Sequence, residues 1–324
     1  MANRKNGPRH GSMQFWPRKR SENHLGRVNW APLIANSKKP GFLGFIGYKA
    51  GMSSAYVKDN TPDSQTKNKK IIVPVTIIEC PPIKIFSVRF YKNGAVKKEL
   101  INENVDKELK RKVKLPKTPL NIKQEIEKIE KENDFDDVRV ITYSQPKKAE
   151  IKKTPDIIEI GLSGTKEDKL KIIKENLSKE ISISEVFSNG LVDIRGLTRG
   201  HGNQGPVRRF GIRLRSHKAE KGQRRPGSVG AWHPTGVRFN VPRAGQLGCF
   251  SRVTYNSHII AVKKASEKNP FIEKGLQHYG KVNADYILLR GSVQGVPKRE
   301  ILMTSSLRPS KKQLKKQFDL IELR

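Results

Sequence analysis

Residues 195–252 constrain the fold of this chain more than any other stretch. Its 58 positions hold eleven arginines, two lysines and eleven glycines against a single acid, Glu220. Few of its side chains belong to the hydrophobic set, and several of these are alanine. Ordering a backbone costs about 1–2 kcal/mol per residue, which so few apolar side chains cannot offset. Because the cations also repel one another, we expect this segment to become ordered against a polyanionic partner.

The charge of the whole chain points to the same kind of partner. The chain has 65 lysines and arginines against 31 acidic residues, a net charge of +34, which is typical of proteins that bind nucleic acid. Residues 1–40 carry nine basic residues and one acid, whereas residues 95–190 hold 21 basic and 19 acidic residues. The first segment predicts a basic arm, and the second predicts a folded unit that faces water.

Neither a membrane span nor a secretion signal is predicted. The longest apolar run, residues 71–78, is interrupted by Pro74 and Thr76 and is too short to cross a bilayer. Residues 1–20 lack the apolar stretch of a signal peptide, so we expect a cytoplasmic protein. Cys80 and Cys249 lie far apart in the sequence, without the close spacing of paired ligands, which predicts neither a disulfide framework nor a zinc site.

Apolar, β-branched runs bounded by Gly, Pro and Asn predict strands at both ends of the folded part. These runs cover residues 42–57, 71–79, 83–91, 249–262 and 286–293. Such an interrupted series suggests a β-barrel whose two halves flank an insertion. Within the insertion, Ile122, Ile126 and Ile129 fall on one face of a predicted helix over residues 121–132, and a second helix is expected over 166–177.

The expected fold class is therefore mainly β with an α+β insertion. We expect a basic N-terminal arm (1–40), a first barrel part (41–94), the insertion (95–190) and a barrel strand (191–198). A basic Gly/Arg-rich extension (199–246), a second barrel part (247–305) and a C-terminal tail (306–324) complete the expected division.

One literal match to a cofactor motif occurs, because residues 200–205 spell GxGxxG. The dinucleotide fingerprint needs a helix to begin at the last glycine. Here Pro206 follows and no apolar helical period develops, so a loop that approaches an RNA backbone explains the glycines better. His201, His217 and His233 recur at even but long intervals, a spacing that matches no local metal motif.

Trp232 has two opposed interpretations. A lone tryptophan is usually a core residue, but this one lies in the middle of the arginine-rich segment between Pro226 and Pro234, with little apolar company. A tip residue that stacks on a nucleobase, or fills an RNA crevice, fits this setting better. The preference for arginine over lysine supports contact with folded RNA, because a planar guanidinium can fork onto a phosphate and stack on a base.

Two other classes of protein fit the sequence less well. A DNA-binding or chromatin protein should show a recognition helix or heptads beside its basic region, whereas this basic region is rich in Gly and Pro. A nuclease or nucleotide-dependent oxidoreductase would need clustered carboxylates or a phosphate loop. The acidic residues are instead concentrated in the insertion.

An ordered set of motifs resembles the large-subunit ribosomal protein L3 family, in the form found in archaea and eukaryotes. The motifs are PRHGS at 8–12, PRKR at 17–20, GYKAGM at 47–52, QGPV at 204–207, GAWHP at 230–234, RAGQ at 243–246, and GSV at 291–293 followed by Gly295. Bacterial members are shorter and usually lack the tryptophan and the large insertion. The sequence has no long C-terminal tail after these motifs, which favours the archaeal form.

The resemblance implies a translation-factor-like β-barrel on the outer face of the large ribosomal subunit. It implies that the basic extension and the arm enter 23S-type ribosomal RNA, with Trp232 at a tip that points toward the peptidyl transferase centre. The expected role is a structural constituent that supports early subunit assembly beside neighbouring large-subunit proteins. No catalytic residue, metal, cofactor, small-molecule substrate or membrane is expected. The expected RNA-binding residues are Arg9, His10, Arg18, Lys19, Arg20, Lys49, Arg199, His201, Arg208, Arg209, Arg213, Arg215, His217, Arg224, Arg225, Trp232, His233, Arg238, Arg243, Gln246 and Arg252.

Overall fold

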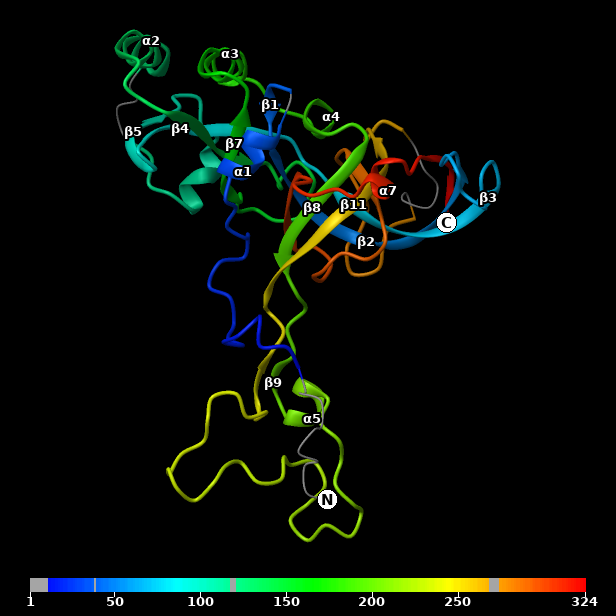
Figure 1. Ribbon diagram of the computed structural model, residues 1–324. Helices are drawn as coiled ribbons and strands as arrows, with labels where there is room; N and C mark the ends of the chain where they lie inside the picture. Colours follow the sequence, from blue (N-terminus) through cyan, green and yellow to red (C-terminus); the bar gives the residue numbers. More distant parts are fainter. Residues whose placement is uncertain (1–10, 38, 117–120, 268–273) are drawn as a thin grey trace. The chain divides into compact units, whose positions relative to one another are not determined.

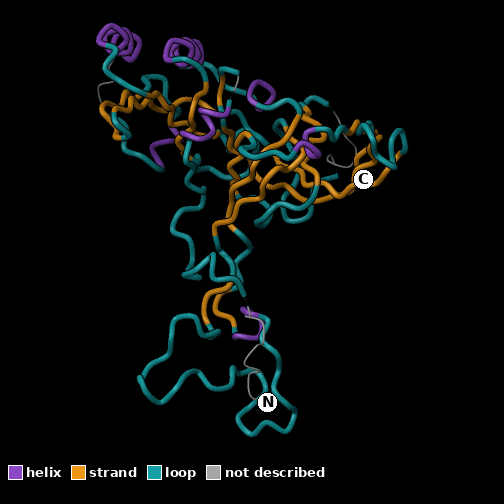
Figure 2. The backbone as a smooth tube through the Cα atoms, in the orientation of Figure 1, coloured by secondary structure: helices purple, strands orange, loops and turns teal. Residues whose placement is uncertain are grey.

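The computed structural model describes residues 11–37, 39–116, 121–267 and 274–324 (Figure 1). The chain forms two compact units. Met1–His24 and Leu197–Arg252 make up the first, here called the extension unit, and Leu25–Gly196 and Val253–Arg324 make up the second, the sheet unit. Strands outweigh helices in the described residues (Figure 2), so the expected mainly β fold class is confirmed.

The sheet unit contains a seven-stranded sheet with the order β13-β8-β11-β12-β3-β2-β14. Its strands are β2 (Gly44–Asp59), β3 (Lys70–Glu79), β8 (Gly190–Leu197), β11 (Ser251–Lys263), β12 (Tyr286–Arg290), β13 (Glu300–Ser305) and β14 (Phe318–Leu323). β13 also pairs with β2, with Leu302 opposite Ile46. The pairings therefore run from β13 through five further strands and return to β13.

The two longest neighbouring strands show why this sequence forms a sheet. β2 and β3 pair antiparallel, with Ala55 opposite Val73 and Val57 opposite Ile71. Ala55, Val57 and Val73 are buried, while Lys58, Ile72 and Pro74 beside them in the two strands are exposed, the two-residue alternation of a strand with one buried face.

A five-stranded sheet with the order β1-β7-β6-β4-β5 forms the rest of the sheet unit. Its strands are β1 (Gly41–Phe42), β4 (Ile83–Lys92), β5 (Ala95–Ile101), β6 (Asp137–Ser144) and β7 (Ile157–Ser163). One short helix, α1 (Ala31–Asn36), precedes the first strand, and further short helical segments lie between later strands at η1 (Lys107–Arg111), α4 (Ile183–Val186) and α7 (Lys311–Leu314).

Both helices predicted in the insertion are confirmed, as α2 (Ile122–Glu132) and α3 (Lys166–Asn176). They lie side by side in Figure 1, and Lys174 of α3 forms an ion pair with Glu130 of α2 at 2.6 Å. The isoleucine face of α2 is buried as predicted. Ile126 belongs to the same hydrophobic core as Ile173 of α3 and Val140 of β6, so both helices pack on the five-stranded sheet.

The structure differs from the expected division at β4. Residues 83–91 form a strand as predicted, but β4 pairs with β5 and β6 in the five-stranded sheet, whereas we grouped it with the first barrel part. An apolar, β-branched run identifies a strand without identifying its partner, because both sheets bury the same kinds of side chain.

The extension unit has little regular structure. Its described elements are β9 (Gly202–Gln204), β10 (Gly245–Leu247) and the short helix α5 (Pro206–Phe210). Among the residues described in this unit, the buried hydrophobic side chains are Leu197 and Phe210. The described part of the chain has no helix long and apolar enough to cross a membrane. Cys80 and Cys249 are free thiols.

Candidate nucleic-acid interface

Positive charge is concentrated in the extension unit. Its sequence holds 18 lysines and arginines against two acids, Glu22 and Glu220, which gives +16 of the net +34 of the chain. Lys19 forms an ion pair with Glu22 at 3.4 Å, with both side chains exposed. So unbalanced a surface favours a polyanion over any neutral partner.

Arg209 organises the base of the unit. Its guanidinium donates three hydrogen bonds to backbone carbonyls: Nε to Gln246 at 3.0 Å, Nη1 to Arg243 at 3.0 Å and Nη2 to Arg18 at 3.1 Å. Burial lowers the pKa of Arg209. Because one rigid fork serves three carbonyls from two distant segments, Arg209 acts as a structural clamp between the N-terminal arm and β10.

An aromatic cluster on the arm supports the same clamp. Arg18 lies over the Phe210 ring at 4.2 Å, and Trp16 packs against Phe210 at 5.7 Å and edge-on against Phe239 at 5.4 Å between ring centroids. The Trp16 indole N–H donates to the Ser12 carbonyl at 2.9 Å. Sequence reasoning missed these aromatic residues, although the succession of aromatic and basic residues around Arg18 is the signal that could have identified them.

Backbone hydrogen bonds join the two chain segments on either side of residues 199–246. The Thr198 N–H donates to Phe250 at 3.0 Å, and the Cys249 N–H donates to Thr198 at 3.2 Å. The arm joins this pair, because the Ser21 N–H donates to the Cys249 carbonyl at 2.9 Å. Arg252 lies over the Phe15 ring at 4.3 Å, and burial lowers its pKa.

Trp232 is 84% exposed, so the structure excludes a core role for it. Its ring contacts His233 edge-on at 6.4 Å. Phe239 is also strongly exposed, at 71%. Two aromatic faces open to solvent within an arginine-rich segment are suited to stacking on nucleobases.

Several arginine side chains are exposed and available to bind a ligand. Among the residues that the structure describes, Arg213, Arg224, Arg225, Arg238 and Arg243 are exposed and their guanidinium groups have no hydrogen-bond or ion-pair partner. Arg215 is held by the Pro226 carbonyl at 3.1 Å. A cavity of about 480 Å³ lies among these side chains, lined by Arg215, Lys221, Arg224, Arg225 and Arg243. Its lining is suited to phosphate groups.

The remaining predicted residues lie in three settings. Lys19, Arg20, Arg199, His201, Arg208, His217 and His233 are exposed in the extension unit, and Gln246 is half-buried in β10. Arg9 and His10 lie outside the described residues. Lys49 belongs to the sheet unit, where it is buried and donates to the Val293 and Gly295 carbonyls at 2.5 and 3.3 Å; burial lowers its pKa. The Lys49 ammonium group therefore has a structural role within the sheet unit.

The GxGxxG segment does not form a dinucleotide site. A short helix, α5, does begin at Pro206, which the sequence did not lead us to expect. However, β9 pairs antiparallel with β10, with Asn203 opposite Gln246, whereas the fingerprint belongs to a parallel βαβ unit. The described residues also contain no group of three or more His, Cys, Asp or Glu placed to hold a metal ion.

Comparison with known proteins identifies the family of this chain. Residues 1–323 match the family Ribosomal protein L3, and the chain belongs to that family. It is 38% identical over 316 residues to the large ribosomal subunit protein uL3 of Archaeoglobus fulgidus, which covers 94% of this chain and 93% of the relative. It is likewise 38% identical over 322 residues to the uL3 of Methanocaldococcus jannaschii, covering 96% of this chain and 94% of the relative.

The uL3 of Methanothermobacter thermautotrophicus is also 38% identical, over 319 residues that make up 94% of this chain and 93% of the relative. These relatives are archaeal, in agreement with the archaeal or eukaryotic form that the sequence motifs indicated. They are ribosomal proteins, so family membership confirms that the chain is not an enzyme.

Proposed function

We propose that this protein is a structural constituent of the large ribosomal subunit and that its extension unit binds 23S-type ribosomal RNA. The observation that carries the proposal is the set of exposed, unpartnered guanidinium groups in a unit with 18 basic and two acidic residues. A guanidinium without a protein partner can fork onto phosphate oxygens without breaking an existing bond. Family membership supports ribosomal RNA rather than DNA as the polyanion.

The contacts described above divide the arginines into two roles. Arg18, Arg209 and Arg252 hold the arm and the extension together through backbone carbonyls and aromatic rings. We assign direct RNA contact to the exposed groups instead. These are Lys19, Arg20, Arg199, His201, Arg208, Arg213, His217, Arg224, Arg225, His233, Arg238 and Arg243. Arg215 lines the same cavity as Arg224, Arg225 and Arg243, and we assign Trp232 as a stacking residue.

Three finer parts of the proposal follow from family membership. We infer that the ring of strands that returns to β13 is a translation-factor-like barrel, with the five-stranded sheet and its two helices as the inserted domain. The extension would reach toward the peptidyl transferase centre with Trp232 foremost. The protein would join the subunit early in assembly, contact neighbouring ribosomal proteins and act in the cytoplasm.

RNA binding by purified variants tests the proposal. The double variant Arg224→Ala/Arg225→Ala should weaken binding to large-subunit RNA and reduce the slope of log affinity against log salt by about one per arginine removed. The matched control is Lys123→Ala/Lys171→Ala, which removes the same charge from exposed positions on α2 and α3. An equal loss in both variants would contradict an RNA surface on the extension unit.

A further inference from the structure

Positive charge is also concentrated in one short segment of the sheet unit. Residues 301–318 contain five basic side chains and no acid. The five are Arg308, Lys311, Lys312, Lys315 and Lys316, and we call them the α7 cluster. None of them is among the RNA-contacting residues assigned above, so the proposed function leaves this concentration of charge unexplained.

The backbone of the segment is held to the sheet unit near both of its ends. The Asn256 side chain donates to the Arg308 carbonyl at 3.1 Å, and His258 Nε2 lies 2.8 Å from the Lys316 carbonyl oxygen. β14 begins two residues after Lys316 and pairs with β2. The α7 cluster is therefore carried by a segment whose position on the sheet unit is fixed.

Helix α7 fixes the middle of the segment. Ser310 Oγ accepts from the Gln313 N–H at 3.2 Å, and Gln313 Oε1 accepts from the Ser310 N–H at 3.1 Å, the reciprocal bonds of a capping box. Lys311 and Lys312 are the first two residues of this helix. Positive charge is unfavourable at a helix N-terminus, so the stability of α7 does not account for these two lysines.

The α7 cluster has little compensating negative charge. Arg308, Lys311 and Lys312 are exposed, and their charged groups have no hydrogen-bond or ion-pair partner among the described residues. Lys315 lies 3.9 Å from Asp63, and the two side chains are 64% and 85% exposed. An ion pair this long and this exposed contributes little.

Lys316 shows that a further strand adds to the crowding of cations. Burial lowers the pKa of Lys316, and the charges of Arg290 on β12 and of Lys312 lower it further, while Asp59 acts in the opposite direction. The Arg290 guanidinium lies over the Phe318 ring at 4.8 Å. Cations from two segments therefore repel one another at this surface, and a bound anion would relieve that repulsion.

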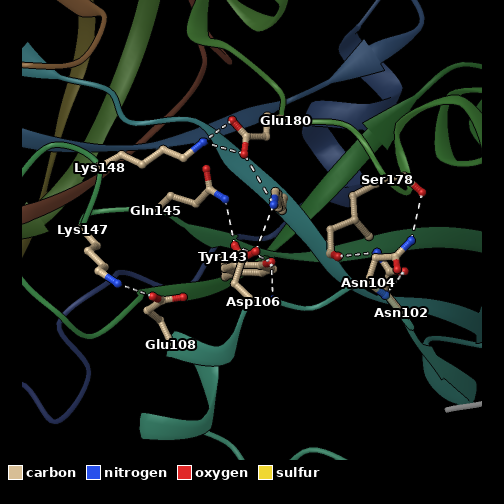
Figure 3. Close-up of polar contacts among 12 residues, drawn as sticks. Asn102, Asn104, Asp106, Glu108, Tyr143, Gln145, Lys147, Lys148, Ser178 and Glu180 are labelled. Carbon is tan, nitrogen blue, oxygen red and sulfur yellow. Dashed lines mark hydrogen bonds and ion pairs between the residues drawn. The ribbon is translucent and has the colours of Figure 1, made fainter.

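Lysines in another part of the sheet unit are matched by acids. Within residues 95–190, Lys147 pairs with Glu108 and Lys148 pairs with Glu180, both at 2.6 Å (Figure 3). That stretch holds 21 basic and 19 acidic residues. The excess charge at residues 308–316 is thus a local property of this surface.

We propose that the α7 cluster binds phosphate groups of the ribosomal RNA backbone, as a second RNA contact that lies on the sheet unit. Four of its five members are lysines, compact point charges that neutralise phosphates without the planar fork of arginine. Residues 308–316 contain no aromatic side chain, whereas the extension unit exposes Trp232 and Phe239. The contact is therefore independent of RNA sequence. This inference rests on the proposed function, because it takes RNA as the partner, but it assigns a different surface.

A protein partner fits the α7 cluster less well. The core of a protein interface is rich in aromatic and other apolar side chains and poor in lysine. Leu314 is the only large apolar side chain in residues 308–316. A phosphate backbone needs cations and no apolar anchor, so the composition of this segment favours RNA.

Lysine acetylation with and without RNA, followed by mass spectrometry of the full-length protein, tests the inference. We expect folded, protein-free large-subunit RNA to protect Lys311 and Lys312 from acetylation. Lys123 and Lys171, which are exposed on α2 and α3, should stay reactive. Lys218 and Lys221 are exposed in the extension unit, and their protection in the same sample reports on the proposed function.

Affinity measurements complete the test. Lys311→Ala/Lys312→Ala should weaken binding to large-subunit RNA about 5- to 50-fold at about 0.1 M salt and lower the slope of log affinity against log salt by about one per lysine. Lys311→Arg/Lys312→Arg should bind like the parent protein, because the contact requires only charge. The matched control Lys123→Ala/Lys171→Ala should also bind like the parent.

The outcomes separate this inference from the proposed function. Protection of Lys218 and Lys221 without protection of Lys311 and Lys312 would overturn the inference alone, whereas protection of neither pair would contradict the proposed function as well. Unchanged affinity in Lys311→Ala/Lys312→Ala would also overturn the inference. Protection of these two lysines in the complete subunit but not by RNA would do the same, because it would identify a protein partner.

Discussion

Arg18 and Arg209 exchange hydrogen bonds across 191 residues of sequence. The Arg18 guanidinium donates to the Arg209 carbonyl at 2.7 Å, and the Arg209 guanidinium donates to the Arg18 carbonyl at 3.1 Å. Two like charges are thereby held close together in a unit that already carries +16. The carbonyl dipoles and the Phe210 ring face these cations, which stabilises them in the absence of acidic partners.

Replacing the clamp residue should release the arm. Arg209→Ala removes three hydrogen bonds from a charged donor, so we expect a local loss of about 1–3 kcal/mol. Amide hydrogen exchange at residues 18–21 and 243–248 should accelerate roughly 5- to 150-fold, in line with that loss. Arg208→Ala is the matched control, because Arg208 is adjacent and exposed. Unchanged exchange in Arg209→Ala would show that the arm is held by other contacts.

Substitution of Trp232 should affect RNA binding, whereas substitution of Trp30 should affect stability. Trp232→Ala should change the unfolding free energy by less than about 0.5 kcal/mol, because the ring is exposed. It should weaken binding to large-subunit RNA by about 1–3 kcal/mol through lost stacking. Trp30→Ala should instead cost about 3–5 kcal/mol of stability, because Trp30 is buried in the core. Denaturant unfolding and RNA titration of both variants check this contrast.

Gly248 should tolerate no side chain. Its backbone has φ +79°, and a Cβ there would lie 2.0 Å from the Arg199 carbonyl oxygen. Gly248→Ala should therefore distort the pairing of residues 198–201 with 247–250 and increase proteolysis at both segments. Gly211 has a similar φ, +67°, with open space around it, so Gly211→Ala should cost only about 1 kcal/mol of backbone strain. Equal effects would show that the close approach to Arg199 does not matter.

Asp59 should stabilise the sheet unit in a pH-dependent manner. Burial alone would raise its pKa, but hydrogen bonds from Thr61, Thr66 and Ser64 outweigh burial and hold the pKa well below its usual range. A carboxyl group with a depressed pKa stabilises the fold above its unfolded pKa, near about 3.9, and loses that effect as the pH falls toward its folded pKa. Asp59→Asn should therefore lower the unfolding free energy at pH 7 by about 1–3 kcal/mol.

The difference between Asp59→Asn and the parent protein should shrink as the pH is lowered below about 4. Denaturant unfolding across pH 2–7 measures it. Asp63→Asn is the control in the same turn, because the Asp63 side chain is 85% exposed. A difference that does not depend on pH would mean that the hydrogen bonds do not require the ionised carboxylate.

The sequence predicted those features whose signals are local. The three-to-four-residue spacing of Ile122, Ile126 and Ile129 identified a helix face, and the absence of apolar neighbours indicated that Trp232 is exposed. Each depends on residues close together in the chain, and so composition and spacing carry the information.

Contacts between distant segments could not be predicted in this way. The clamp on Arg209 depends on the backbone carbonyls of Arg18, Arg243 and Gln246. Every residue has such a carbonyl, so residue type does not show which carbonyls accept hydrogen bonds from Arg209. The sequence shows the lysines of the α7 cluster, but not that Arg290 of β12 adds its charge to theirs. The pairing partner of each strand could not be predicted either, because pairing depends on how distant segments come together in the fold and not on which residues form the strand.

The most direct test of the account is RNA crosslinking with sequencing on a cell extract fractionated through a sucrose gradient. We predict that the protein sediments with the large subunit and that residues 199–246 crosslink to 23S-type RNA near the peptidyl transferase centre. A free protein crosslinked to DNA, or to scattered RNAs without a preferred site, would contradict it.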